Sequence, residues 1–399
     1  SPAPKRVAII GAGVSGILTA SAFQRVEGFK LNIFERRAVP GGIWVYDQKP
    51  TSAPQFPAVD PWDIDRLLTP PSGKLPVTTD RATHQRFLTT PMYEYLQANI
   101  PWGVMAGNTI FEDAASPKDA ETPFLSSSEV LAAVSQASHK FDDLIHYNTT
   151  VEDVVKLLDG SLQLTLRQEN RDGTDTWYNQ SYDHVVVATG HNSVPKVPDI
   201  PGLETWKGAL RHSVTWRSGK EFTDQRVLVV GSSESAIDLC VYSKEYAKGP
   251  IYISQRTPHP RYPSVFEHHG IKVVTTIDRI DGRKIHLSDG TVLGDVDTIV
   301  FATGYFYSYP FLSKVRPSRT TGSGRVPGLY QHVFDVHNPD TIAFIGVVNG
   351  SLSWLTWEKS AFLVALLWSG KIRLPPKEAQ EEWERKRLET VQESRFHVL

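Results

Sequence analysis

The stretch RVAIIGAGVSG, residues 6–16, decides the fold of this chain. Its first five residues form an apolar run typical of a strand that is buried on both faces. Three glycines follow in GxGxxG spacing, and a helical pattern continues to about Gln24. The first glycine permits a tight turn, the second lets the backbone approach a pyrophosphate, and the third lets the helix pack closely on the strand. We expect cofactor contacts along this loop at Gly11, Gly13, Val14, Ser15 and Gly16.

An acidic residue ends the next expected strand. The run Leu31–Phe34 is followed by Glu35, 19 positions after Gly16. A carboxylate at this place accepts hydrogen bonds from a ribose 2′-OH and repels a 2′-phosphate, so the site favours FAD or NAD over NADP. Arg36 follows directly and is a further expected cofactor contact. The alternative is a glycine-rich loop in an unrelated α/β protein.

A second unit of the same kind begins at Arg226 with RVLVVGSSESAID. Only the first of the three glycines is kept, but serine and alanine are the next smallest residues. The serine hydroxyls add donors for phosphate oxygens. The expected contacts in this loop are Gly231, Ser232, Ser233, Ser235 and Ala236.

The second unit closes on a basic residue where the first closes on an acidic one. Its next strand, Ile251–Ser254, leads to Arg256 and Thr257. A guanidinium is a bidentate, charge-assisted partner for a 2′-phosphate. The alternative is that Arg256 ends a strand in solvent. The difference between the two units assigns FAD to the first and NADPH to the second.

Two further strands repeat each other. VVVATG at 185–190 and IVFATG at 299–304 each fall where the chain should pass between the units, and a proline-rich stretch follows the first. We therefore predict an α/β fold of two Rossmann-like dinucleotide-binding domains, with the NADPH domain inserted in a discontinuous FAD domain. The expected FAD domain covers 1–197 and 300–399, and the NADPH domain covers 198–299.

Composition excludes several other classes of protein. A formal net charge of -2 gives no reason to expect nucleic acid. The single cysteine, Cys240, cannot supply the dithiol of a disulfide reductase. The 13 histidines show no metal-ligand spacing. No stretch approaches the roughly 18 apolar residues of a membrane span. We expect a cytoplasmic protein without a metal, and a homodimer is compatible with the sequence.

Eight motifs together resemble the flavin-containing monooxygenases, over nearly the whole chain. They are GAGVSG, Glu35, GGIW (41–44), TTPMYEYLQANIP (89–101), ATGHNSVPKVPDIPGL (188–203), WKGALRHSVTW (206–216), GSSESAID and ATGY (302–305). The resemblance implies a mechanism in which NADPH reduces FAD and dioxygen then forms a flavin hydroperoxide. A soft sulfur or nitrogen centre of a small molecule attacks that oxidant.

The resemblance also implies site residues. Asn99 matches the asparagine that lies over the flavin in the family, although from sequence alone it also fits a helix C-cap before Pro101. A neutral amide both donates and accepts hydrogen bonds there. Further expected cofactor contacts are Gly42, Ile43, Trp44, Met92, Val151, Ala188, Thr189 and Gly190.

The chain departs from the family pattern at two places. In the fingerprint region, Gly208 and His212 are kept, but Trp216 stands where Tyr or Phe is usual and Arg217 follows. Baeyer–Villiger monooxygenases carry such a tryptophan, so a ketone substrate stays open. We expect His212 to orient the domains. An uncoupled NADPH oxidase or redox flavoprotein is the other alternative.

The second departure is Glu234, which places a carboxylate in the phosphate loop. It must point away or meet a cation, or else face the substrate and favour an amine. Near the C-terminus, Trp354 and Trp357 are candidates for the substrate channel or for core packing.

Overall fold

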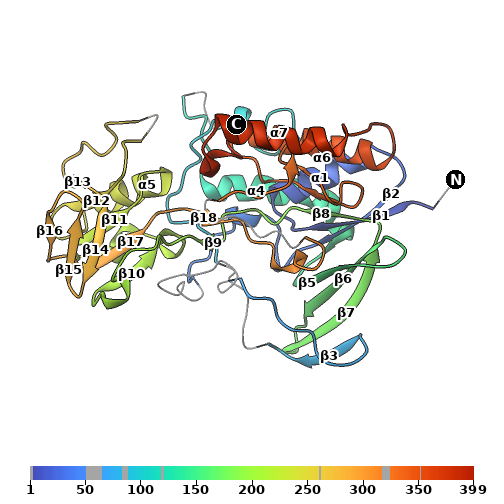
Figure 1. Ribbon diagram of the computed structural model, residues 1–399, viewed down its shortest axis with the longest axis horizontal. Coiled ribbons are helices and arrows are strands. Elements are labelled where there is room, and N and C mark those ends of the chain that lie inside the picture. Colours follow the sequence, from blue (N-terminus) through green and yellow to red (C-terminus); the bar gives the residue numbers. More distant parts are fainter. Residues whose placement is uncertain are drawn as a thin grey trace.

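The structure, a computed structural model, describes residues 3–50, 65–82, 89–117, 121–259, 262–316, 324–350 and 352–399. Two α/β units lie side by side and are joined by two neighbouring linkers (Figure 1). The first unit is built on a seven-stranded sheet in the order β19 (Leu329–Tyr330), β20 (Phe334–Asp335), β21 (Ile342–Phe344), β8 (His184–Val187), β1 (Lys5–Ile10), β2 (Phe29–Phe34) and β4 (Ile145–His146).

Strands β21, β8, β1, β2 and β4 run parallel, as expected for a nucleotide-binding fold. The first unit also contains a four-stranded antiparallel sheet in the order β3 (Val77–Asp80), β7 (Thr174–Tyr182), β6 (Leu162–Glu169) and β5 (Thr149–Lys156). Its helices are α1 (Val14–Gln24), α3 (Trp102–Met105), α4 (Ser127–Ser138), α6 (Ser353–Trp368) and α7 (Lys377–Thr390).

The second unit is built on a five-stranded sheet in the order β10 (Ala209–His212), β17 (Thr298–Phe301), β11 (Val227–Val230), β12 (Ile251–Ser254) and β13 (Ile271–Val274), all parallel. A single helix, α5 (Glu234–Ser243), covers one face in the described part of this unit. The other face carries an antiparallel sheet of β14 (Ile277–Asp281), β15 (Lys284–Leu287) and β16 (Val292–Leu293).

Short 3-10 turns connect these elements. They are η1 (Gly42–Trp44), η2 (Glu112–Ala114), η3 (His139–Leu144), η4 (Leu203–Thr205), η5 (Ser213–Thr215), η6 (Gly219–Phe222), η7 (Pro310–Leu312) and η8 (Glu393–Arg395).

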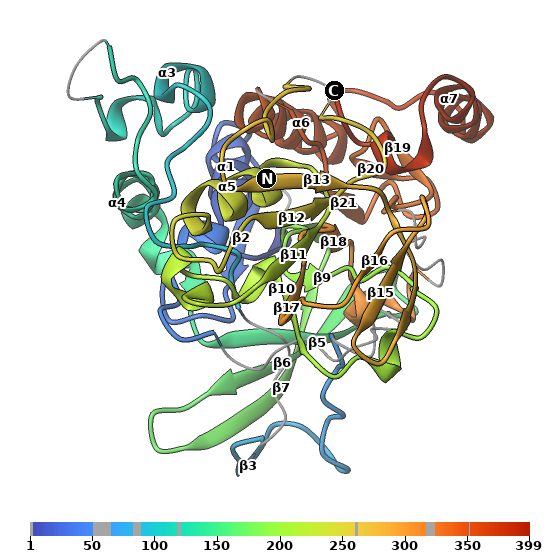
Figure 2. The ribbon, with the colours of Figure 1, turned by 90° about the vertical axis from the view of Figure 1, so that its left-hand side faces the viewer.

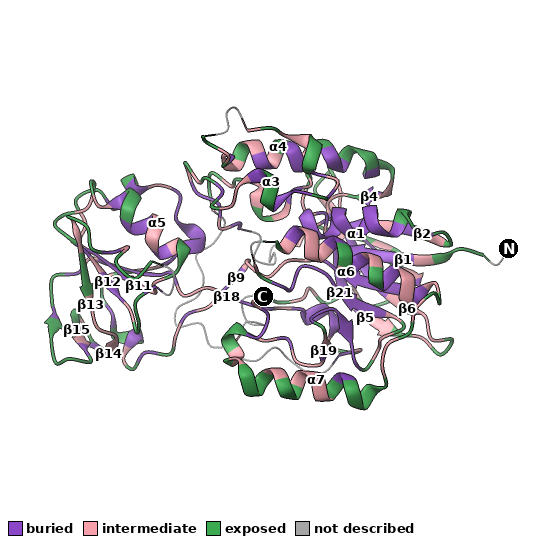
Figure 3. Cartoon of the chain, turned by 90° about the horizontal axis from the view of Figure 1, so that it is seen from above, coloured by how far each residue is buried: buried purple, intermediate pink, exposed green. Residues whose placement is uncertain are grey.

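The apolar run of β1 is explained by burial on both sides. Val7 and Ile9 pack in the cluster that contains α1, α4 and α6, whereas Ala8 and Ile10 pack in the cluster of the antiparallel sheet. The helices and the strands β5, β6 and β7 lie on opposite sides of the main sheet (Figures 1 and 2). Figure 3 shows that α1 is a buried helix, while α7 exposes much of its surface. The first unit is therefore a three-layer structure.

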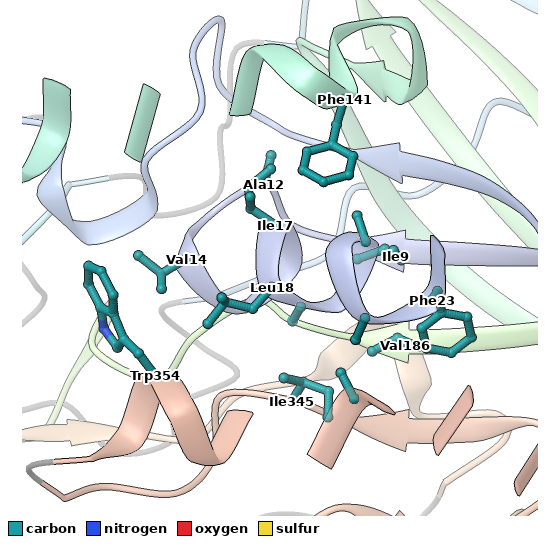
Figure 4. Packing of buried hydrophobic residues seen from close by; sticks show 14 of the residues in the cluster. Ile9, Ala12, Val14, Ile17, Leu18, Phe23, Phe141, Val186, Ile345 and Trp354 are labelled. Atoms are coloured by element: carbon teal, nitrogen blue, oxygen red, sulfur yellow. The ribbon is translucent and has the colours of Figure 1, made fainter. Parts of the chain in front are cut away.

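Figure 4 shows the packing around α1 at closer range, with Ile9 and Val186 of the sheet near the helix and Trp354 of α6 beside Val14. The second unit repeats the arrangement on a smaller scale. Val229 faces the cluster of α5, and Leu228 faces the cluster of the three-stranded sheet. Cys240 is fully buried in α5, where burial raises the pKa of its thiol. This thiol is a core residue.

The prediction of two Rossmann-like units, one inserted in the other, is confirmed, whereas the expected domain borders stay a prediction. Strand β17 continues to Phe301 and pairs with β10 and β11. The return linker starts after this strand. There, β18 (Tyr305–Phe306) pairs with β9 (Val194–Pro195) of the outgoing linker.

Candidate flavin and nucleotide sites

The first glycine loop leaves no room for side chains. Gly11 has φ +108°, and a Cβ there would lie 2.5 Å from the Ala188 carbonyl oxygen. A Cβ on Gly16 would lie 1.9 Å from the carbonyl oxygen of Gly11, which is the close approach of helix and strand that the motif predicts. Gly13 caps α1 without a side-chain hydrogen bond. The N-terminus of α1 is thus open to an anion.

The second loop has the same relation to its own ATG strand. Gly231 has φ +119°, and a Cβ there would lie 2.3 Å from the Ala302 carbonyl oxygen. This explains why VVVATG and IVFATG repeat, since each passes beneath the first glycine of its unit. Ser233 caps α5 without a side-chain hydrogen bond, and Ala236 is fully buried where the first unit has Gly16.

Glu35 is held by backbone donors at the end of β2. The N–H of Ala12 donates to Oε2 at 2.8 Å and the N–H of Arg37 donates to Oε1 at 2.8 Å. The carboxylate is 5% exposed and lines the main cavity. The Arg37 guanidinium pairs with both oxygens of Asp47, at 2.9 and 3.0 Å. The positive charge of Arg37 is therefore compensated by Asp47 and not by Glu35.

One cavity of about 330 Å³ brings together most of the residues expected to contact the flavin. These lining residues are Gly11, Gly13, Val14, Ser15, Glu35, Arg36, Gly42, Ile43, Trp44, Asn99, Val151, Ala188, Thr189 and Gly190. Gly16 and Met92 do not line it. Gly16 lies against the loop beneath the cavity, and Met92 is 3% exposed in the core.

The residues of this cavity fit FAD. Gly11, Gly13 and Gly42 form a backbone cradle in which a Cβ would collide or crowd its neighbours. The Thr189 hydroxyl is buried and has no hydrogen-bond partner among the described residues, as expected for a donor that serves a ligand. Glu35 stands where a ribose hydroxyl would bind.

Asn99 lies on the cavity and not at the end of a helix. Residues 89–98 form no helix, and Asn99 is in an exposed bend. Pro101 is the N-cap of the short helix α3 that follows. The C-cap alternative is therefore wrong.

Both tryptophans from the C-terminal segment line the cavity. Trp354 also packs against Trp44, Trp102 and Phe111, with ring centroids 5.2 to 6.5 Å apart. Trp357 donates its ring N–H to the carbonyl of Val348 at 2.9 Å. The lining and core-packing interpretations thus both hold for Trp354.

His191 and Asn349 are lining residues that the sequence reasoning missed. The Nδ1 of His191 lies 2.9 Å from the Gly346 carbonyl oxygen and its Nε2 lies 3.1 Å from Asn349 Oδ1. Burial lowers the pKa of His191, which favours the neutral ring. The position directly after the ATG motif was the available signal for His191, whereas Asn349 lies 158 residues further along the chain.

Arg256 and Thr257 lie exposed at the end of β12, on a second cavity of about 320 Å³. Lys272 of the neighbouring strand β13 lines the same cavity. Burial and the positive charge of Arg256 lower the pKa of Lys196, which lies on the linker. Neither Arg256 nor Lys196 forms an ion pair within the described ranges. Free cations near one another are typical of an anion-binding site.

The glycine loop of the second unit does not line either cavity described above. Gly231, Ser232 and Ser235 are partly exposed and Ser233 is exposed, so they stay accessible at the N-terminus of α5. Glu234 is also exposed there, and its Oε1 lies 3.8 Å from His259 Nε2. The carboxylate therefore lies beside an ionisable ring, and it does not line the cavity of about 330 Å³.

The fingerprint region links the two units. His212 is fully buried, accepts the N–H of Val214 at 3.1 Å through Nδ1 and contacts the Gly304 carbonyl oxygen at 3.1 Å through Nε2. Burial lowers its pKa to about 3, so the ring is neutral. Because Nδ1 accepts a hydrogen bond, Nε2 carries the hydrogen and donates it in a hydrogen bond to the Gly304 carbonyl oxygen. This arrangement joins the loop after β10 to the return linker and leaves His212 without an acid–base role at neutral pH.

Arg217 makes a second link. Its guanidinium donates to the carbonyl oxygens of Val214 and Trp216 in its own unit, at 2.9 and 2.8 Å. It also donates to those of Thr90 and Asp47 in the first unit, at 2.9 and 2.5 Å. Trp216 is 2% exposed, and its ring centroid lies 4.5 Å from that of Tyr93.

The described ranges contain neither a candidate metal site nor a candidate membrane span. Their histidine, cysteine and carboxylate side chains form no group of three that could hold a metal ion. None of the helices in those ranges is both long and apolar enough to cross a membrane.

Comparison with known proteins gives a consistent family. Residues 104–268 and 260–397 match the family described as flavin-binding monooxygenase-like, and residues 9–55 match the NAD(P)-binding Rossmann-like domain. The flavin-containing monooxygenase FMO GS-OX-like 2 of Arabidopsis thaliana is 30% identical over 387 residues, covering 95% of this chain and 77% of the relative.

Solved structures agree with this fold. The S-allyl-L-cysteine S-oxygenase from Allium sativum superposes with a TM-score of 0.78 at 26% identity, covering 99% of this chain and 85% of that one. The cyclohexanone monooxygenase from Rhodococcus sp. Phi1 bound to NADP+ has a TM-score of 0.60 at 14% identity, over 99% and 91% of the chains, and shares the fold. The chain belongs to the flavin-binding monooxygenase-like family and is a flavoprotein monooxygenase that uses FAD and NADPH.

Proposed function

We propose that this enzyme transfers one oxygen atom of dioxygen to a soft sulfur or nitrogen centre of a small molecule. The balanced reaction consumes NADPH, a proton and dioxygen, and it yields NADP, water and the S- or N-oxide. Bound FAD would supply the oxidant, the flavin hydroperoxide that the family resemblance implies. The protein's own contribution is then to bind, orient and exclude water.

The observation that carries this proposal is the place of Asn99 on the flavin cavity, beside an apolar wall. Asn99 shares the cavity with Trp44, Ile100, Trp354 and Trp357. A neutral amide can hold a polar group by hydrogen bonds without acting as a proton donor of appreciable acidity. The aromatic wall would keep water away from the reacting atoms.

We further propose that the first unit binds FAD and the second binds NADPH. Glu35 in the first unit and Arg256 in the second support this division by their charges. The FAD domain would comprise 1–197 and the C-terminal part, and the NADPH domain would comprise the inserted part up to the end of β17 at Phe301.

Sulfur oxygenation is supported by the likeness to the S-allyl-L-cysteine S-oxygenase. The ketone alternative rested on Trp216, and this ring packs against Tyr93 between the units, outside the residues lining the flavin cavity. Its position gives no reason for a carbonyl substrate. The uncoupled oxidase alternative predicts NADPH consumption without product.

The test is a single comparison of substrates. The enzyme, reduced by NADPH, is mixed with isotopically labelled dioxygen and an aryl methyl thioether, a tertiary amine or a cyclic ketone. We expect one labelled oxygen atom in the sulfoxide or N-oxide, and NADPH consumption that matches product. Labelled ester from the ketone alone would establish the Baeyer–Villiger alternative, and hydrogen peroxide as the sole product would establish the oxidase.

A further inference from the structure

A hydrogen bond between Tyr93 and Asp238 crosses from one unit to the other. Tyr93 lies in the segment 90–99 of the first unit, and its hydroxyl donates to the Asp238 carboxylate. Asp238 lies in the second turn of α5, the helix whose N-terminus follows the second glycine loop. Tyr93 is 7% exposed and Asp238 is half-buried, so the bond is partly shielded from solvent. Partial shielding strengthens a charge-assisted bond of this type.

The electrostatics keep Tyr93 as the donor. Burial raises the pKa of the Tyr93 hydroxyl, and the negative charge of Asp238 raises it further. Burial also raises the pKa of Asp238, while the bond from Tyr93 opposes that change. The tyrosine is therefore protonated at neutral pH, and the aspartate is its acceptor.

Residues 90–94 of the same segment make several other contacts with the second unit. The N–H of Glu94 donates to the Arg217 carbonyl oxygen at 2.7 Å. The Arg217 guanidinium donates to the Thr90 carbonyl oxygen at 2.9 Å. The ring of Tyr93 packs on Trp216. Residues 90–94 are thus held on several sides by the inserted unit.

The other end of the segment reaches the flavin cavity. Asn99 lies six residues after Tyr93 and lines the cavity. The N–H of Ala98 donates to the Leu125 carbonyl oxygen at 2.8 Å, which fixes that end to the first unit. The chain between the contact with α5 and Asn99 is therefore short, and hydrogen bonds hold it at both ends.

We propose that Asp238 is a positioning residue. Through its hydrogen bond with Tyr93, it fixes the position of Asn99 relative to the glycine loop of the second unit. The proposal rests on the proposed use of both units by the two cofactors. Hydride transfer requires reacting atoms about 3–3.5 Å apart, and a misplacement of about 1 Å can cost on the order of 100-fold in rate. Neither Tyr93 nor Asp238 lines the flavin cavity, so both act indirectly.

The test uses the FAD-loaded enzyme and three variants of the pair. Tyr93→Phe removes the donor, Asp238→Leu removes the acceptor, and Asp238→Asn keeps an acceptor oxygen. Tyr242→Phe is the matched control because Tyr242 lies one turn further along α5, is exposed, and its hydroxyl has no hydrogen bond within the described residues. Flavin reduction by NADPH is followed without oxygen in a stopped-flow instrument, and NADP+ affinity is measured by fluorescence titration.

We expect Tyr93→Phe and Asp238→Leu to slow flavin reduction by about 10-fold or more, with NADP+ affinity changed less than about threefold. Asp238→Asn should stay within about threefold of the wild-type rate, and Tyr242→Phe should equal it. The double variant Tyr93→Phe/Asp238→Leu should be no slower than either single variant, because the two side chains form one contact.

Two results would overturn the proposal. One is flavin reduction at the wild-type rate in Tyr93→Phe. The other is a fall of the reduction rate and the NADP+ affinity of the variants by the same factor, as a binding role predicts. Flavin reduction is measured without any substrate to be oxygenated. A failure of the proposed oxygenation reaction would therefore leave this test intact, and the two failures can be told apart.

Discussion

The backbone N–H of Ala12 donates a 2.8 Å hydrogen bond to the Glu35 carboxylate, which connects the glycine loop to the acidic end of β2. The second carboxylate oxygen accepts the N–H of Arg37 at 2.8 Å. An amide at position 35 offers one acceptor oxygen for these two donors. The loop conformation and the flavin ribose would thus depend on the same side chain.

We predict that Glu35→Gln weakens FAD binding by about 1–3 kcal/mol, because one backbone N–H loses its acceptor and the ribose loses a charged partner. FAD retention is measured by dialysis and reconstitution of the apoprotein. Glu27→Gln is a suitable control, since it changes an exposed carboxylate near the end of α1. Full retention of FAD by the Glu35 variant would contradict the assignment of the first unit.

Much of the architecture could be predicted because it depends on short-range patterns. The strand Ile251–Ser254 has the predicted bounds, and α1 ends at Gln24 as expected. Glycine spacing predicted the close approach at Gly16 because only backbone sterics decide it. Burial on both faces of β1 followed from its unbroken apolar run.

The contacts between the units could not be predicted in this way. Arg217 stood out only as a departure from a family pattern, yet it bridges Thr90 and Asp47, which lie 127 and 170 residues away in the chain. The pairing of Tyr93 with Asp238 spans 145 residues. Such contacts depend on how two folded units dock, and no local periodicity carries that information. The position of Asn99 needed the family resemblance for the same reason.

The second prediction concerns the nucleotide that the second unit selects. Arg256→Ala should weaken NADPH binding by about 1.5–3 kcal/mol, the loss of a charged hydrogen-bonded pair. NADH binding should change little, because NADH lacks the 2′-phosphate. Titration of both nucleotides against variant and wild type measures the difference. Equal weakening toward NADPH and NADH would refute the role of Arg256.

The third prediction concerns Glu234. Its exposed carboxylate lies at the N-terminus of α5, near the expected phosphates, with His259 as its neighbour at 3.8 Å. Glu234→Gln removes a negative charge and should tighten NADP+ binding by a few-fold, an effect that falls with added salt because exposed charges are screened.

The Glu234→Gln variant also tells apart two possible locations of this carboxylate, beside the nucleotide phosphates or facing the substrate. Because this residue does not line the flavin cavity, amine and thioether substrates should respond equally. A selective loss of amine oxidation would show instead that the carboxylate faces the substrate. The measurement is the ratio of kcat/KM for a matched amine and thioether, in the variant and in the wild type.

The fourth prediction is a loss of stability in mild acid, caused by buried histidines. Burial lowers the pKa of His212 to about 3 and those of His184 and His332 to about 4, from an ordinary value of 6.5. Between the lowered and the ordinary value, the unfolded chain binds more protons than the native protein does. Stability therefore rises with pH in this window and is fully present above about 6.5.

We accordingly expect the melting temperature to be level above pH 7 and to fall progressively as the pH drops from about 6.5 toward 4. Asp47 contributes at lower pH, because its pKa lies below the ordinary 3.8 and its ion pair with Arg37 is lost only below that value. His332→Phe should flatten part of the slope between pH 6.5 and 4, because it removes a proton-binding group from the unfolded chain. His139→Phe is the control, since His139 is exposed. A variant at position 332 that kept the full wild-type slope would show that other groups control the acid response.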